Sequence, residues 1–277
     1  MADDVEVTMK GATLRATFAN EGVAPVEACR VVVERIEREQ PRSVALACDF
    51  ASPGASWAAA LEGRTLTSVT SFIFDTDFQT QTRQRDNSIG DLAATLAACP
   101  KLERLFATGK LALSACEHAP LREIHLLGDP LTPELLAALG TSRFPRLEQL
   151  TLSLASDAGP GPEHEALAAI ARLQAPMLRG LFLAGGGSAE ETLGVIGSIA
   201  RVKEVTIYAP IDDEDMLLEA IEANAEALRK FTLVALPFAD FCSEDAFERA
   251  RELVPAIRDA SDVPNSTLPA AYESWLA

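Results

Sequence analysis

One short pattern of leucine-like residues recurs along the chain and limits what the chain can fold into. Each copy has an apolar anchor, two variable residues, an apolar residue, one variable residue and another apolar residue. Clean copies span 121–126, 147–152 and 178–183, and softer copies span 102–107, 202–207 and 228–233. The anchors recur about every 25 residues. Such self-similarity is typical of proteins that stack one supersecondary unit repeatedly.

Two weaker copies precede these, at residues 41–46 and 66–71. The step from the second of them to the copy at 102 is longer than the others, and the excess fits a polar insertion at 75–88. Loops outside a repeat plan often carry function, although polar insertions are also tolerated without one. The insertion is therefore a candidate functional loop.

Segments with helical periodicity separate the short strands. Thr132 with Pro133, and Ser188 with Glu191, are typical of helix starts. The strands alternate apolar with polar residues, which predicts that only one strand face is buried, whereas the strands of a doubly wound sheet are buried on both faces. The sequence therefore predicts an α/β solenoid with a parallel sheet that is open to water on one side and covered by helices on the other.

The repeat resembles leucine-rich repeats, nearest to the ribonuclease-inhibitor-like branch with helices on its outer face. The resemblance covers residues 41–240, about eight repeats, and implies a horseshoe with a concave parallel sheet. The family pattern places Asn or Cys about three residues after the last strand leucine. The corresponding residues here are Lys110, Asp129, Ala155, Gly186, Pro210 and Leu236. The repeats are therefore divergent and lack the Asn/Cys ladder.

Both ends of a solenoid core need covering. Residues 1–40 predict an N-terminal cap, made of a hairpin around Lys10-Gly11 and a helix over 25–40. Residues 241–277 predict a C-terminal cap, with an amphipathic helix over 243–260 bent by Pro255, and a tail. Whether the tail at 268–277 docks on the cap or is a free ligand peptide stays open.

Strand alternation predicts which side chains line the open, concave face. Six of them are candidate partner-binding residues: Phe106, His125, Leu127, Phe182, Tyr208 and Val234. Solvent-facing aromatic residues are the anchors that protein interfaces use. The alternative is that aromatic and β-branched residues are there because they favour strands.

Charge and composition exclude several classes of partner. The chain has 41 acidic and 24 basic residues, a net charge of −17, which argues against DNA, RNA and anionic membranes because phosphate binding needs clustered Lys and Arg. No apolar run approaches the length of a membrane helix, and the first residues show no secretory leader. Five scattered cysteines without Cys-x-x-Cys indicate thiols in a reducing compartment, so we expect a cytoplasmic protein.

Catalytic chemistry has little support in the sequence. His125 on the inner face, with Glu123 two residues away, is the only pair worth a test, and Cys116 near His118 lacks a third, orienting group. The run Asp212–Asp215 has no calcium-loop spacing and begins a predicted helix, and the glycines at 185–187 are followed by acids that would repel phosphate. We expect no catalytic residue, no metal and no cofactor.

These observations favour a non-catalytic scaffold that binds a partner protein, of unknown identity, on its concave face. Two alternatives remain. One is an adaptor whose acidic convex face binds a basic partner. The other is an enzyme with a site at the strand ends or in the 75–88 loop.

Overall fold

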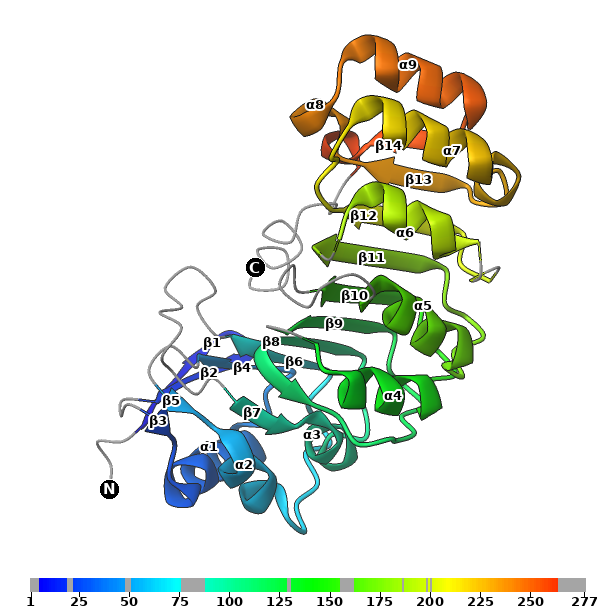
Figure 1. The fold of residues 1–277 in the computed structure, drawn as a ribbon. Coiled ribbons are helices and arrows are strands. Elements are labelled where there is room, and N and C mark those ends of the chain that lie inside the picture. Colours follow the sequence, from blue (N-terminus) through cyan, green and yellow to red (C-terminus); the bar gives the residue numbers. More distant parts are fainter. Residues whose placement is uncertain are drawn as a thin grey trace. The chain divides into compact units, whose positions relative to one another are not determined.

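The computed structural model describes residues 5–18, 22–47, 51–75, 88–128, 131–154, 162–185, 187–197, 199 and 201–263 (Figure 1). The chain forms two compact units, residues 1–147 with 173–177, and residues 148–172 with 178–277. Short strands alternate with helices in both units, and the strands form mostly parallel sheets. The predicted α/β class is confirmed, and the arrangement is compatible with a solenoid. The horseshoe, the caps and their boundaries stay predictions.

The first unit contains thirteen of the described elements. They are β1 (Val5–Lys10), β2 (Thr13–Phe18), β3 (Gly22–Val23), α1 (Val26–Glu39), β4 (Ser43–Ala47), β5 (Ala51–Ser52), α2 (Gly54–Leu61), β6 (Ser71–Asp75), β7 (Ser88–Asp91), α3 (Leu92–Ala98), β8 (Arg104–Ala112), β9 (Glu123–Gly128) and α4 (Pro133–Thr141). The sheet order is β1-β2-β4-β6-β8-β9, antiparallel only between β1 and β2. β7 pairs β8 outside this order, and β3 pairs β5 separately.

The core of the first unit lies between its sheet and helices. Phe72 on β6 pairs in register with Val44 on β4 and Leu105 on β8, and all three are buried. Trp57 of α2 packs on Phe72 with ring centroids 5.6 Å apart, and its Nε1 donates to the buried Thr95 Oγ1 of α3 at 3.0 Å. The indole is thereby buried with its one polar atom satisfied, as the burial of tryptophan requires.

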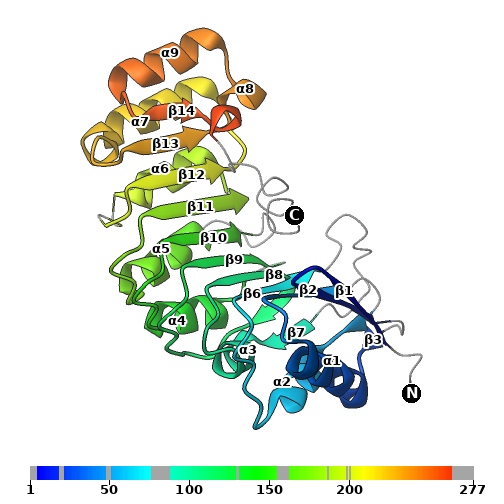
Figure 2. The same ribbon diagram turned by 180° about the vertical axis from the view of Figure 1, so that it is seen from behind.

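The second unit contains the remaining described elements. They are β10 (Gln149–Leu154), α5 (Pro162–Arg172), β11 (Gly180–Gly185), α6 (Ala189–Ile196), β12 (Glu204–Tyr208), α7 (Glu214–Leu228), β13 (Leu233–Leu236), α8 (Phe238–Phe241), α9 (Glu244–Leu253), β14 (Ile257–Asp259) and the 3₁₀ turn η2 (Ala260–Asp262). The strands pair in chain order, all parallel. Helices α5, α6, α7 and α9 lie on one side of this sheet, and Figure 2 looks onto its other side (Figures 1 and 2).

A repeated backbone contact joins consecutive strands at their amino ends. The carbonyl oxygen of Thr70, for example, accepts hydrogen bonds from the amides of Glu103 at 2.9 Å and Arg104 at 3.1 Å. The same double acceptance recurs at the carbonyl oxygens of Ala12, Arg42, Glu103, Glu148, Arg179 and Lys203. Two amides of each turn are thus satisfied by backbone and not by a side chain.

Helix starts follow the sequence signals. Thr132 Oγ1 accepts from the Leu135 amide at 3.3 Å, and Ser188 Oγ accepts from the Glu191 amide at 3.3 Å. Asp213 caps α7 through the amides of Asp215 and Met216. These three caps confirm the predicted starts to within two residues. None of the described helices is long and apolar enough to cross a bilayer.

The register of two strands differs from the predicted copies of the repeat. β6 pairs through Phe72 and Phe74, so that copy is anchored at Val69 and not at Leu66. β13 pairs Val234 with Val205 of β12, so its copy is anchored at Phe231 and not at Leu228. Both shifts are three residues. The pattern has apolar residues at its first and fourth positions, and it therefore matches itself when displaced by three.

The predicted helix over 243–260 is too long. α9 ends at Leu253, and Ile257–Asp259 forms β14, which pairs parallel with β13. Pro255 is the cause, because a proline cannot continue a helix and drives the preceding residue into extended conformation. Val254 has ψ 96° and begins a further strand copy rather than a bent helix.

Candidate functional site

The three predicted face residues of the first unit are buried. Phe106 and His125 pair across β8 and β9 with ring centroids 6.1 Å apart, and they are 3% and 7% exposed. Leu127, further along β9, is 5% exposed. Their side chains therefore offer little area to a partner, and the expectation of a solvent-facing row fails here.

His125 is also a poor general base. Desolvation by burial lowers the pKa of its imidazole from 6.5 to about 4, so the ring is neutral at physiological pH. Glu123, the predicted companion, lies two residues earlier on β9. A group this deeply buried cannot meet a diffusing substrate without movement of its neighbours.

Val234 is not on the open face. Its pairing with Val205 places it in the helix-side layer, where it is fully buried. Because side chains alternate along a strand, a displacement of three residues moves every side chain of β13 to the opposite face. Ala235 occupies the open-face position, opposite Thr206 of β12.

The open face of the second unit keeps two of the predicted residues. Phe182 on β11 is half-buried and pairs in register between Thr151 of β10 and Thr206 of β12. Tyr208, at the end of β12, is 42% exposed. They are the two aromatic side chains with solvent exposure on the sheet side opposite the described helices, and the flanking Thr151 and Thr206 are 5% and 7% exposed.

Further exposed apolar residues lie at the carboxyl ends of the strands. Met216, in the first turn of α7, is 57% exposed, and Phe241, at the end of α8, is 49% exposed. The Tyr208 hydroxyl donates to Asp240 Oδ2 at 3.5 Å, and the Ser243 amide donates to Glu214 Oε2 at 3.0 Å. These contacts bring β12, α7 and α8 together at this edge.

The repeat pattern did not single out these edge residues. Met216 stands directly before a true core residue, Leu217, so helical periodicity counts it as part of the buried stripe. Phe241 belongs to a four-residue helix that no repeat signal marks. An apolar residue in the first turn after a strand end is the one hint that the sequence offers.

A buried acid lies behind the same edge. Glu190, the second residue of α6, is 9% exposed, and both of its carboxylate oxygens lack a hydrogen-bond partner among the described residues. Burial, then the negative charges of Glu214, Glu190 and Asp259, raise the pKa of the Cys242 thiol to about 11. The described acids therefore gather around Cys242, which stays a neutral thiol.

The Cys116 and His118 pair does not form a nucleophilic centre. Burial raises the pKa of Cys116, and its amide donates to Ser142 Oγ at 3.1 Å. His118 Nε2 contacts the Leu102 carbonyl oxygen at 3.0 Å, and burial lowers its pKa. Thiolate chemistry needs a lowered pKa, so both residues are placed as structural groups.

Asp91 organises the loop around Cys116. Its Oδ1 accepts from the amides of Ala93 and Ser114, each at 2.9 Å, and its Oδ2 accepts from Ser114 Oγ at 2.5 Å. Burial acts to raise the pKa of Asp91, but these hydrogen bonds outweigh it and hold the pKa below its usual value. The carboxylate is fully used in capping α3 and fixing the loop.

Several other candidates are placed by the structure. Asp213 is a helix cap, and no three His, Cys, Asp or Glu side chains of the described ranges could together hold a metal ion. His164 is exposed on α5. The insertion over 76–87, Gly186 and the tail from 264 onward lie outside the described residues.

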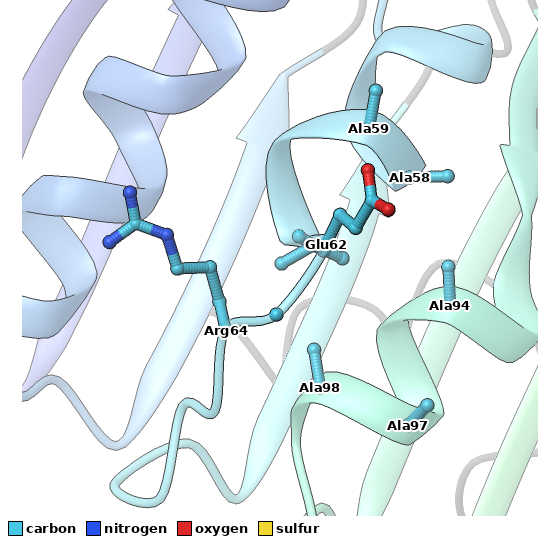
Figure 3. A pocket seen from close by; sticks show the side chains of 9 residues that line it. Ala58, Ala59, Glu62, Arg64, Ala94, Ala97 and Ala98 are labelled. Carbon is cyan, nitrogen blue, oxygen red and sulfur yellow. The ribbon is translucent and has the colours of Figure 1, made fainter.

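A pocket of about 450 Å³ lies between α2 and α3 in the first unit (Figure 3). Its lining is Ala58, Ala59, Leu61, Glu62, Gly63, Arg64, Ala94, Ala97 and Ala98. Figure 3 shows Arg64 directed toward the neighbouring helix, where its guanidinium pairs with Glu37 at 2.8 Å. Glu62 supplies the one other charged side chain of this lining, which otherwise consists of alanines, Leu61 and Gly63.

No protein-family model and no curated protein matches the chain. A crystal structure of a protein from Bacteroides fragilis, determined as a structural-genomics target, has a similar fold. The TM-score is 0.64 at 14% sequence identity, over 83% of this chain and 70% of that one. At such low identity the likeness shows the fold alone.

Proposed function

We propose that the chain is a divergent leucine-rich-repeat protein that acts as a non-catalytic scaffold in the cytoplasm. It binds a partner protein on the open sheet face of its second unit. The observation that carries the proposal is that the described helices α5, α6, α7 and α9 lie on one side of that sheet, whereas on its other side Phe182 is half-buried and Tyr208 is exposed (Figures 1 and 2). Exposed aromatic side chains on a rigid sheet are common anchors of protein interfaces.

The repeat architecture supports this interpretation. At the repeated turns before the strands, a carbonyl oxygen of the preceding turn accepts two backbone amides, and at Arg42 and Lys203 it also accepts the hydroxyl of Thr70 or Thr232. The side chains of the open face are then free to specify a partner. The described cysteines and the histidines His118 and His125 have pKa values that disfavour nucleophilic and general-base roles.

A tagged full-length chain tests the proposal in extracts of the source cells. The double variant Phe182→Ser and Tyr208→Ser should reduce recovery of the bound protein by at least about tenfold, as for interface anchors. Met177→Ser is the matched control, because Met177 is a 54% exposed apolar residue of the first unit. Equal recovery with the double variant and the wild type would contradict binding at this face.

The second candidate function is an adaptor that binds a basic partner through its acidic helix side. From Ile211 to Glu226 the chain has seven acids and no base, and the acids of α7 are exposed. A complex that forms equally well in the Phe182 and Tyr208 double variant, but dissociates steeply with salt, would favour this candidate over the sheet face.

A further inference from the structure

The carboxyl edge of the second unit combines exposed apolar side chains with uncompensated acids. We define this edge by Glu190, Tyr208, Glu214, Met216, Asp240 and Phe241. The five large apolar side chains exposed among the described residues are Val31, Met177, Tyr208, Met216 and Phe241. Three of them belong to this one edge. Singly exposed apolar residues are ordinary, whereas a group of them next to one another marks a contact surface.

Hydrogen bonds connect the segments that carry the edge residues. Tyr208 reaches Asp240, which precedes Phe241, and the amide of Ser243 reaches Glu214, two residues before Met216. The Ala189 amide donates to the Pro210 carbonyl oxygen at 2.9 Å, which fixes the first turn of α6 against the segment that follows β12. Glu190 is the next residue of that turn.

The acids of this edge lack a positive partner within the described part of the chain. No Lys, Arg or His side chain of those segments pairs with Glu190, Glu214 or Asp240, and the ion pairs of the second unit lie elsewhere, at Glu148 and Glu248. Glu214 also caps a backbone amide, as acids at helix starts do. Glu190 is different, because it is over nine-tenths buried and neither oxygen has a described donor.

A buried carboxylate without donors is costly, and a positive group bound among the neighbouring acids would offset that cost. The exposed apolar side chains beside it would be covered at the same time. Both needs are met by one kind of ligand, a protein segment that presents a lysine or arginine between apolar side chains. An inorganic cation would meet only the first.

We propose that the carboxyl edge docks a basic, apolar segment of the partner protein, with a lysine or arginine side chain bound at the exposed Glu214 and Asp240 and attracted also by the charge of the buried Glu190. The inference rests on the proposed function, since it names the chemistry of the partner of the same unit. Tyr208 belongs to both surfaces and joins the edge to the open face.

The test uses the full chain and two labelled peptides. One peptide carries lysines between leucines, and the matched peptide carries norleucine at each lysine. The lysine peptide should bind at least about tenfold more tightly, and its affinity should fall with added salt. Glu190→Gln and Phe241→Ser should each weaken it several-fold. Glu222→Gln, an exposed acid elsewhere on α7, and Met177→Ser are controls expected to bind as the wild type does.

Three results would overturn the inference. They are equal affinity for the two peptides, unchanged affinity in both edge variants, and calorimetric saturation by Ca²⁺, Mg²⁺ or Mn²⁺ alone that Glu190→Gln abolishes. The last would assign the edge to a metal ion. If Phe182→Ser loses the native partner but the wild type does not bind the lysine peptide, this inference is wrong and the proposed function stands. If the wild type binds the lysine peptide at the edge but Phe182→Ser still recovers the native partner fully, the proposed function is wrong and this inference stands.

Discussion

At the scale of single residues, burial decides more than residue type. Phe106 and Phe182 occupy equivalent strand positions in the repeat, yet one is 3% exposed and the other is half-buried. Glu190 sits in a predicted capping box, where an acid should be solvated, and the structure buries it. The solvent exposure of these side chains depends on the segments that pack over them, and the repeat pattern carries no information about those segments.

His125 should make stability depend on pH. Its folded-state pKa of about 4 lies below its usual 6.5, so between these values the unfolded chain binds more protons and stability falls as pH decreases. From pH 7 to pH 5 we expect His125→Gln to lose about 2 kcal/mol less than the wild type. Urea unfolding at both pH values measures this difference.

The control for this prediction is His164→Gln, because His164 is exposed. It should track the wild type at both pH values. If His125→Gln loses as much stability on acidification as the wild type does, the imidazole is not buried as the structure places it.

At the scale of elements, turns and caps follow local chemistry, whereas register does not. Thr132, Ser188 and Asp213 begin helices as their side chains predict. β6 and β13 are displaced by three residues from the predicted copies. A pattern that matches itself at an offset of three leaves two registers open, and only pairing with the neighbouring strand selects one.

Gly90 in β7 should be irreplaceable. It has φ +78°, and a Cβ there would lie 2.4 Å from the Gly54 carbonyl oxygen at the start of α2. Gly90→Ala combines a left-handed backbone with a backbone clash, so we expect a loss of about 2–4 kcal/mol in the free energy of unfolding. Urea denaturation measures the loss.

Gly63→Ala separates the two causes. Gly63 has φ +70°, and no atom lies within 4 Å of the position that a Cβ would take, so this variant carries backbone strain alone and should lose about 1 kcal/mol. Equal losses in the two variants would mean that β7 and α2 do not approach as closely as the structure shows.

At the scale of the whole molecule, the net charge affects stability independently of the repeat fold. Part of the negative charge that makes up the net −17 lies away from the open face of the second unit, because the acidic run Ile211–Glu226 lies in and before α7. Self-repulsion of this size opposes a compact state, and salt screens it.

Moderate salt should therefore stabilise the protein. Raising NaCl from low millimolar to physiological concentration shortens the Debye length to about 8 Å, and we expect the midpoint of thermal unfolding to rise by a few degrees. Differential scanning fluorimetry measures it, with an equal osmolarity of sucrose as control. A midpoint that falls with salt would show that attractive surface ion pairs dominate instead.

The amino-acid sequence by itself determined the alternation of short strands with helices, the parallel sheets, the helix caps and the helix-side core, because these depend on local periodicity and backbone geometry. The tertiary structure alone decided which face residues are covered, the register of β6 and β13, the pairing of β14 with β13, and the carboxyl edge around Glu190. The physical reason is that these features depend on contacts between segments that are far apart along the chain. The free energy of each placement is set by those contacts, which a local sequence pattern does not specify.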